Sequence, residues 1–119
     1  MKLEVGQFVR FKDKRNITYI RKIREIPQDN RYASIYLDKE ANYSKGLSLK
    51  NIIKASYNII DILEKGDYIN GLLVNKIVDG KPIHEDYNDP FYSFGWENDD
   101  IKTVITHEQM EQMSYKIKE

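Results

Sequence analysis

Cysteine is absent from the 119 residues, and histidine occurs only twice, as His84 and His107. Without cysteine the chain has no disulfide framework and no thiolate metal site. The stretch that begins at His107 also lacks the second histidine that a metalloprotease helix carries four residues further on. We therefore interpret both histidine clusters as solvated surface and expect no metal and no other cofactor.

Glycine and proline are sparse, with six and three residues respectively. The glycines are scattered singly, so the sequence has no glycine-rich phosphate loop, and it has no Gly-x-Ser-x-Gly nucleophile elbow. The acidic stretch 86–97 carries Phe91 where a calcium loop requires glycine. No two carboxylates stand out as an acid–base pair. We predict that the protein is not an enzyme.

Long apolar runs are also missing. No segment approaches the roughly 18 consecutive apolar residues of a membrane span. Residues 1–20 carry charges throughout, where a signal peptide would have an apolar core. These absences predict a cytoplasmic protein with no membrane partner. Strand edges in a β-rich chain are compatible with either a monomer or a homodimer.

The first half of the sequence is dominated by strand patterns. Residues 7–12 alternate between apolar and polar types, and residues 17–26 and 32–37 are rich in β-branched and aromatic side chains. A turn is predicted at residues 27–30, where proline precedes aspartate and asparagine. These segments predict a three-stranded antiparallel meander.

The second half contains two hairpin signals and two short helical segments. Asn70-Gly71 and Asp79-Gly80 each stand between short apolar runs, and both dipeptides favour the tight turn of a β-hairpin. Thr106 and Gln109 have the spacing of a capping box, which predicts a helix near 106–113. A helical turn is also expected at 58–63. The predicted class is mainly β, a β-rich α+β fold with one or two short helices.

A short motif occurs twice, 60 residues apart. Residues 4–10 and residues 64–70 both read acidic, any residue, glycine, polar, aromatic, β-branched, polar. Glycine would allow the chain to turn sharply into a strand in each copy. The repeat predicts two related units, antiparallel meanders or small barrels like SH3 or KOW modules, over residues 1–56 and 57–119. One continuous domain remains the alternative.

The charges divide between the same two halves, although the net charge is zero. Residues 1–60 carry a net charge of +7, and residues 61–113 carry −8. Such asymmetry indicates a charged partner, or it indicates that the two halves attract one another across the fold. Both interpretations are kept open.

The basic half offers a candidate surface for nucleic acid. Alternate residues of a strand share one face, so cations at positions 10, 12 and 14 would form a row, with tyrosine rings nearby to stack on bases. The alternative is that these residues form the solvated face of a sheet. The candidate nucleic-acid-binding residues are Arg10, Lys12, Lys14, Arg15, Arg21, Lys22 and Arg24.

The acidic half offers a candidate surface for a protein partner. Residues 84–100 hold six acidic and five aromatic residues and no lysine or arginine. Exposed aromatic side chains inside a polar rim are typical of protein-binding sites. Within this segment, Phe94 and Trp96 are also candidates for anchoring the core. The candidate protein-binding residues are Tyr87, Asp89, Phe91, Tyr92, Trp96, Glu97, Asp99 and Asp100.

Residues 58–71 and 101–109, together with the opening residues 5–10, resemble small uncharacterised proteins encoded by phages and prophages of low-GC Gram-positive bacteria. The resemblance covers about a third of the chain and supplies no catalytic residues. It implies an accessory protein in the cytoplasm of a bacterial host that binds and modulates or inhibits a host protein, including inhibitors of antiviral defence such as anti-CRISPR-like proteins. The alternative from the residues themselves is a small-barrel nucleic-acid-binding protein.

Overall fold

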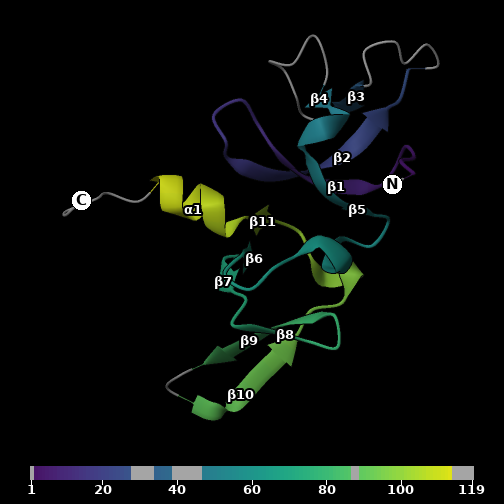
Figure 1. Ribbon diagram of the computed structural model, residues 1–119. Coiled ribbons are helices and arrows are strands. Elements are labelled where there is room, and N and C mark those ends of the chain that lie inside the picture. Colours follow the sequence, from purple (N-terminus) through teal and green to yellow (C-terminus); the bar gives the residue numbers. More distant parts are fainter. Residues whose placement is uncertain (1, 28–33, 39–46, 87–88, 114–119) are drawn as a thin grey trace.

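The computed structural model describes residues 2–27, 34–38, 47–86 and 89–113. Within these residues, strands dominate and form three small antiparallel sheets, accompanied by one α-helix and three 3₁₀ turns (Figure 1). The predicted mainly β class is therefore confirmed. The sheets do not close into barrels.

The first half forms a five-stranded sheet. Its strand order is β4-β3-β2-β1-β5, so β5 returns to pair with β1. The 3₁₀ turn η1 (Leu49–Asn51) directly precedes β5. The predicted three-stranded meander corresponds to β1, β2 and β3. The strands are β1 (Phe8–Lys12), β2 (Thr18–Glu25), β3 (Ser34–Leu37), β4 (Leu47–Ser48) and β5 (Ile52–Ser56).

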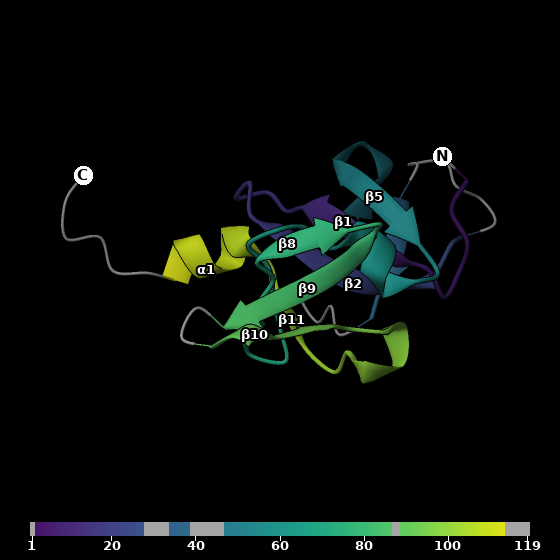
Figure 2. The ribbon, with the colours of Figure 1, turned by 90° about the horizontal axis from the view of Figure 1, so that it is seen from below.

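The second half forms two three-stranded sheets, with orders β11-β6-β7 and β10-β9-β8. The sheet of β8, β9 and β10 lies at the opposite end of the molecule from β3 and β4, and it faces the viewer in Figure 2. The elements are η2 (Ile59–Ile62), β6 (Tyr68–Ile69), β7 (Leu72–Leu73), β8 (Lys76–Val78), β9 (Lys81–Asp86), β10 (Asp89–Gly95), η3 (Asn98–Asp100), β11 (Val104–Ile105) and α1 (His107–Met113).

Both predicted hairpin turns are present. The φ angles are 52° and 84° at Asn70 and Gly71, and 49° and 79° at Asp79 and Gly80. Two successive positive φ angles define the type I′ turn, which matches the twist of the flanking strands. The turn at 70–71 joins β6 to β7, and the turn at 79–80 joins β8 to β9.

The predicted capping box at the start of α1 is also present. The Gln109 backbone N–H donates to Thr106 Oγ1 at 3.1 Å, and the Thr106 N–H donates to Gln109 Oε1 at 3.0 Å. This reciprocal pair satisfies two backbone groups that a helix start leaves without partners.

The two copies of the repeated motif adopt the same turn. Gly6 and Gly66 have φ angles of 96° and 98°. In each copy, the backbone N–H of the first residue donates to the side chain of the fourth, at 2.9 Å for Gln7 and 2.8 Å for Asp67. The similarity seen in the sequence therefore extends to the hydrogen bonds of the backbone.

The same connectivity surrounds both copies. After the first turn, β1 lies between β2 and β5; after the second, β6 lies between β7 and β11. Ile23 and Val74 occupy equivalent positions, since their N–H groups donate to Gln7 O and Asp67 O, each at 2.8 Å. A 3₁₀ turn precedes the last strand of each half. The repeat thus predicts a local turn and also the arrangement of strands around it.

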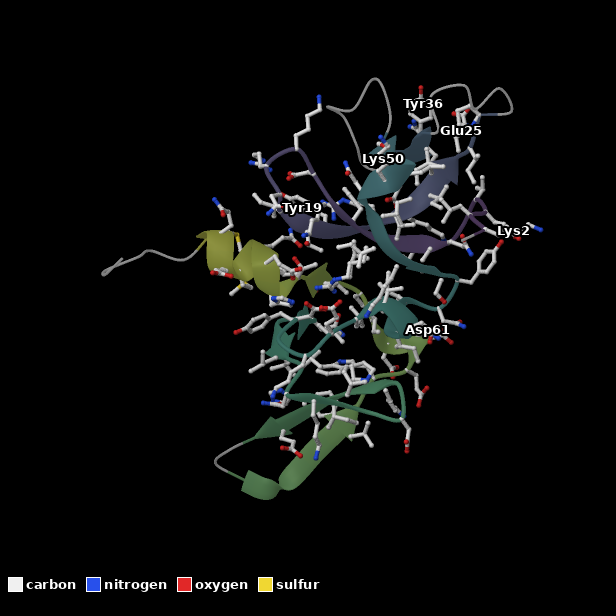
Figure 3. The ribbon with its side chains drawn as sticks, in the orientation of Figure 1. Lys2, Tyr19, Glu25, Tyr36, Lys50 and Asp61 are labelled. Atoms are coloured by element: carbon white, nitrogen blue, oxygen red, sulfur yellow. The ribbon has the colours of Figure 1, made fainter. Side chains whose placement is uncertain are left out.

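Two clusters of buried apolar side chains hold the strands together. The first contains Val9, Phe11, Ile23, Ile35 and Leu37. The second contains Ile20, Ile62, Leu63, Ile69, Val74 and Trp96, with Phe8 packed against it. Because Phe8 and Ile20 come from β1 and β2, the second cluster draws on both halves of the chain. Side chains from both halves fill the space between them (Figure 3).

The equivalent glycines provide a matched test of the repeat. Alanine at either position is expected to cost about 1–2 kcal/mol of stability, because an L-residue is strained at positive φ. The loss should be larger for Gly66→Ala, whose Cβ would lie 3.2 Å from His107 Cβ, than for Gly6→Ala, whose Cβ would lie 3.6 Å from the Tyr57 ring. Urea unfolding measures the loss of stability in both variants. A Gly66→Ala variant as stable as the wild type would contradict the packing of Gly66 against His107.

Candidate functional site

A buried arginine joins the two halves of the chain. Arg10 is fully buried, and its guanidinium donates two hydrogen bonds to the Asp67 carboxylate, at 2.7 and 3.1 Å. It also donates to Glu108 Oε1 at 2.9 Å and to the Ile62 carbonyl at 3.3 Å. A two-point contact between guanidinium and carboxylate fixes both groups in orientation as well as distance.

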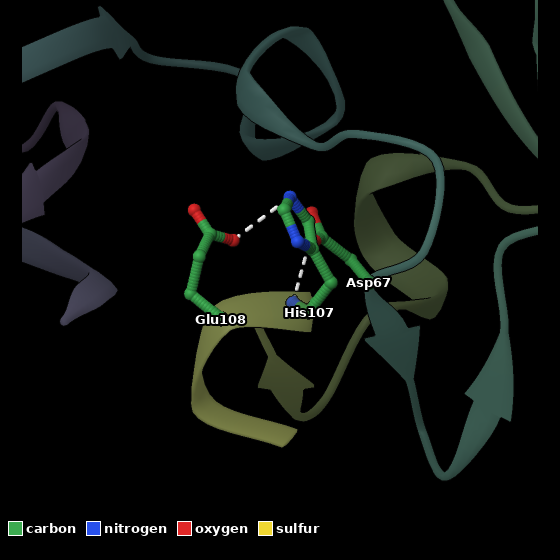
Figure 4. A group of neighbouring side chains, drawn as sticks. All are labelled: Asp67, His107 and Glu108. Carbon is green, nitrogen blue, oxygen red and sulfur yellow. Dashed lines mark hydrogen bonds and ion pairs between the residues drawn. The ribbon is translucent and has the colours of Figure 1, made fainter. Parts of the chain in front are cut away.

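Further charged groups extend this network. Glu64 Oε2 lies 3.4 Å from Arg10 Nε and 3.3 Å from Lys54 Nζ. His107 Nε2 lies 2.8 Å from Glu108 Oε1 and 3.5 Å from Glu64 Oε1. Figure 4 shows Asp67, His107 and Glu108 side by side at the start of α1. We call Arg10, Lys54, Glu64, Asp67, His107 and Glu108 the ion-pair network.

Asp67 has three structural roles at once. Its carboxylate accepts the Glu64 N–H of its own turn at 2.8 Å and the His107 N–H at the start of α1 at 3.0 Å, in addition to the bonds from Arg10. The first copy of the motif has a neutral glutamine, Gln7, at the equivalent position. The charge at Asp67 is therefore what allows the second turn to bind the basic half.

The ion-pair network explains part of the charge asymmetry between the two halves of the sequence. Positive and negative residues of the two halves attract one another across the fold, at least through Arg10 and Lys54. Arg10 is consequently unavailable to phosphates, and its assignment as a nucleic-acid contact is wrong. Strand alternation placed it on a solvated face with Lys12, but the second half of the chain covers that face at Arg10, while Lys12 stays exposed.

Asp67, His107 and Glu108 have the composition of a metal-binding group, with ligand atoms within 4.8 Å of one another. Arg10 already supplies the positive charge that a metal ion would bring to this group, because its guanidinium donates to both carboxylates. The Asp67 carboxylate also accepts two backbone N–H groups. The cluster is therefore fully accounted for as an ion-pair network.

Two members of the network have shifted pKa values. Burial by itself would lower the pKa of Arg10, but the hydrogen bonds that it donates to Asp67 and the charges of the three carboxylates outweigh burial and raise that pKa. Burial would raise the pKa of Glu64, but the charges of Arg10 and Lys54 outweigh it and lower that pKa below 4.5. The network therefore favours the ionised form of both groups.

The lowered pKa of Glu64 predicts a pH dependence of stability. Its contribution is complete above pH 4.5, the ordinary value, and is lost as the pH falls through the lower pKa of the folded state. Glu64→Gln should therefore lose less stability than the wild type between pH 4.5 and more acidic values. Urea midpoints measured across this range test it. Parallel curves for the two proteins would contradict the prediction.

A cleft of about 780 Å³ lies between β2 and the segment 98–104. Its apolar lining includes Phe8, Ile20, Ile59, Ile101 and Val104. Three cations also line it, Arg21, Lys22 and Lys102, together with two carboxylates, Asp38 and Asp99. The cleft therefore combines an apolar surface with charges of both signs.

Trp96 lies in the core of the second half. It is 3% exposed, and its ring makes a T-shaped contact with Phe94 at 4.9 Å between centroids. The prediction that Trp96 anchors the core is confirmed, and its assignment as a protein-binding residue is wrong. A side chain buried to this extent offers no surface to a partner.

The acidic residues that follow Trp96 are at the surface. Glu97, Asp99 and Asp100 are all exposed, at or next to the turn η3. Tyr87 lies outside the described residues, as do the side chains of the remaining predicted contacts, Asp89, Phe91 and Tyr92. The structure therefore places three of the predicted protein-binding residues on the surface, and one of them, Asp99, lines the cleft.

The predicted basic residues do not form one continuous row. Lys12, Lys14, Lys22 and Arg24 are exposed. Arg15 is also exposed, but its guanidinium lies 3.2 Å from Asp13 Oδ2 and 2.8 Å from the Tyr19 hydroxyl. Arg21 pairs with Val9 and is half-buried. Since successive residues of a strand point to opposite faces, the Arg21 side chain lies on the face opposite to Lys22 and Arg24.

The cleft itself was not predicted from the sequence. Lys102, Thr103 and Val104 line it although they belong to the acidic half and to no charged or aromatic run. Their position depends on the pairing of β11 with β6, which brings residues 104 and 69 together. The repeat was the available signal, because β11 occupies the place in the second half that β5 occupies in the first.

Comparison with known protein families, curated proteins and solved structures finds no match to this chain. None of the helical segments that the structure describes combines the length and the apolar character needed to cross a membrane. The fold and the site define a small, mainly β protein with a duplicated turn, an internal ion-pair network and an open cleft.

Proposed function

We propose that this protein is a non-enzymatic accessory protein that binds a host protein and modulates or inhibits it. The phage context comes from the sequence resemblance alone. That resemblance makes components of antiviral defence the first class of partner to examine. The observation that carries the proposal is the rigid display of acidic side chains at η3.

Three sets of contacts hold η3 in place. The Glu97 N–H donates to Asp100 Oδ2 at 3.2 Å, as part of a reciprocal capping box between these two residues. Asn98 Oδ1 accepts the Ile60 N–H at 3.1 Å, and Asn98 Nδ2 donates to Asn58 Oδ1 at 3.2 Å. Glu97 also pairs with Lys81.

The turn directly follows the buried Trp96, which fixes its start. A surface that is ordered before binding loses less conformational entropy when a partner arrives. Exposed carboxylates in a fixed arrangement also select partners by charge complementarity. These properties favour recognition of a basic protein surface.

Affinity capture from a lysate of a low-GC Gram-positive bacterium tests the proposal, with Asp99→Lys as the variant. Asp99 is exposed, and its backbone carbonyl accepts from Lys102 Nζ at 3.1 Å, so the substitution leaves the bonds that hold η3. We expect one protein to be captured by the wild type and lost with Asp99→Lys. Glu25→Lys, an exposed acid of β2, is the matched control and should retain it. Equal capture by all three proteins would contradict the role of η3.

The exposed cations of the first half support a second candidate, nucleic-acid binding. Lys12, Lys14, Lys22 and Arg24 remain free of the ion-pair network, and the Arg24 guanidinium lies 5.9 Å above the Tyr36 ring. Each phosphate contact contributes about −0.9 to the log–log slope of affinity against salt. A gel-shift titration should therefore show a slope reduced by about two in Lys12→Ala plus Lys14→Ala. Absence of binding at low salt would end this candidate.

A further inference from the structure

Among the described strands, none pairs with the cleft-facing edge of β2 at Ile20. The Ile17 carbonyl accepts the Asp13 N–H at 2.9 Å, and the Ile23 N–H donates to Gln7 O at 2.8 Å, so the odd-numbered residues of β2 bond toward β1. Backbone groups in an antiparallel pair alternate in direction. The N–H and C=O of Ile20 therefore point away from β1, and the C=O accepts a hydrogen bond from the Arg21 guanidinium at 2.8 Å. Among the described strands, β3 pairs with β2 only further along, beginning at Ile23.

The opposite wall of the cleft is also a strand edge. The Asn70 N–H donates to the Thr103 carbonyl at 3.0 Å, and Val104 stands opposite Ile69 in the register of β11 and β6. By the same alternation, the N–H and C=O of Val104 point away from β6. In the part of the chain that the structure describes, β11 pairs with β6 alone.

The two edges meet at one end of the cleft. Thr106 Oγ1 donates to the Thr18 carbonyl at 2.6 Å, which joins the end of β11 to the start of β2. From this junction the walls continue along β2 to Lys22 and back along the chain from β11 to Lys102. The cleft is thus a slot, closed by a hydrogen bond at one end and lined by cations toward the other.

We propose that this slot binds an extended peptide segment of the protein partner. The inference rests on the proposed function: the slot holds one segment of the partner, while η3 faces a basic surface of the same partner beside it. The peptide backbone pairs with the strand edge at Val104, and the Ile20 N–H on the facing wall donates to the peptide, a recognition mode in which main-chain hydrogen bonds supply affinity. Apolar side chains of the peptide contact Phe8, Ile20 and Val104. An acidic side chain reaches Lys22 and Lys102.

The charges of the slot favour a peptide over a nucleic acid. Asp38 is fixed at the wall, since its carboxylate accepts the Lys22 N–H at 3.1 Å and its own N–H donates to the Lys22 carbonyl at 2.9 Å. Asp99 is exposed on the other side. A phosphate backbone would bring successive negative charges past both carboxylates. A short peptide with acidic side chains only at its ends brings fewer negative charges past them, and its backbone pairs with the strand edge at Val104.

Titration of the ¹⁵N-labelled protein with the peptide acetyl-Glu-Val-Thr-Val-Glu-amide tests the inference by NMR. We expect shifts of the backbone amides at Ile20 and Val104 and slower hydrogen exchange of these two amides. The charge-reversed peptide, with lysine at both ends, should bind about tenfold more weakly. No shift at either amide, or equal affinity for the two peptides, would overturn the proposal.

Two variants sharpen the same titration. Lys22→Glu plus Lys102→Glu should weaken binding of the acidic peptide by at least about tenfold and should improve binding of the lysine peptide. Lys65→Glu, an exposed lysine outside the slot, is the matched control and should change neither affinity. A hexamer of thymidylate is the third probe. Shifts at Ile20 and Val104 with the hexamer but not with the peptide would replace the peptide by nucleic acid.

Failure of this inference is distinguishable from failure of the proposed function. If affinity capture identifies a partner that Lys22→Glu plus Lys102→Glu still binds, the protein binds its partner elsewhere and only the slot assignment is wrong. If the peptide binds as expected but no partner is captured, the slot stands and the proposed host partner is wrong.

Discussion

Replacing Asp67 by leucine is expected to lower the free energy of unfolding by about 3–5 kcal/mol, because the substitution leaves the buried Arg10 without its closest anionic partner. Asp67 is fully buried and accepts two hydrogen bonds from Arg10, one from the Glu64 N–H and one from the His107 N–H. Urea unfolding followed by the fluorescence of the buried Trp96 measures the loss.

The repeat supplies the matched control for this experiment. Gln7 makes the same bond to its own turn, at 2.9 Å from the Glu4 N–H, but it holds no arginine. Gln7→Leu should therefore cost only about 0.5–1.5 kcal/mol, the net value of one hydrogen bond. Equal losses for Asp67→Leu and Gln7→Leu would show that the ion-pair network adds nothing to the turn.

Trp96→Ala is expected to have an effect of similar size, about 3–5 kcal/mol, because it removes the largest apolar side chain of the second cluster and leaves a cavity. The ring packs on Phe94 and lies 6.3 Å from the His84 ring. Since the variant has no tryptophan, unfolding is followed by far-UV circular dichroism. The exposed acids of η3 should lose their fixed arrangement together with the core.

Leu72→Ala is the control for the tryptophan substitution. Leu72 is 40% exposed, so the loss should stay below about 1 kcal/mol. If Trp96→Ala lost as little stability as Leu72→Ala, Trp96 would not anchor the core, and its role as a surface contact would again be open.

Features that depend on a few consecutive residues could be predicted from the sequence. Asn70-Gly71 and Asp79-Gly80 specify their turns because these residues tolerate positive φ. Thr106 and Gln109 specify the start of α1 because their side chains reach each other's backbone N–H. The repeated turn is equally local, since its glycine and its capping side chain lie within four residues.

The site depended on contacts between distant residues, and these could not be predicted. Alternation along β1 places Arg10 and Lys12 on the same face, but it does not show that 57 residues later Asp67 covers one of them. The fate of Trp96 was also ambiguous, because an aromatic residue among acids fits both a core anchor and a binding surface. Only the packing of β10 against the second cluster decides between them.

The charge asymmetry has gained a structural meaning from these contacts. Some of these charges pair with one another inside the molecule. Arg10 and Lys54 of the first half form ion pairs with carboxylates of the second half, namely Glu64, Asp67 and Glu108. The charges that stay exposed include cations of β1 and β2 and the carboxylates of η3. Lys22 of β2 and Asp99 of η3 both line the cleft.

A double-mutant cycle on Arg10 and Asp67 tests most directly whether this pair joins the two halves. Arg10→Met and Asp67→Leu should each be strongly destabilising. The double variant, which replaces the ion pair by apolar side chains, should be less destabilised than the sum of the two by at least about 2 kcal/mol. If the two single losses of stability add up to the loss of the double variant within about 0.5 kcal/mol, the account is contradicted. Additive losses would mean that the two side chains act independently and do not hold the halves together.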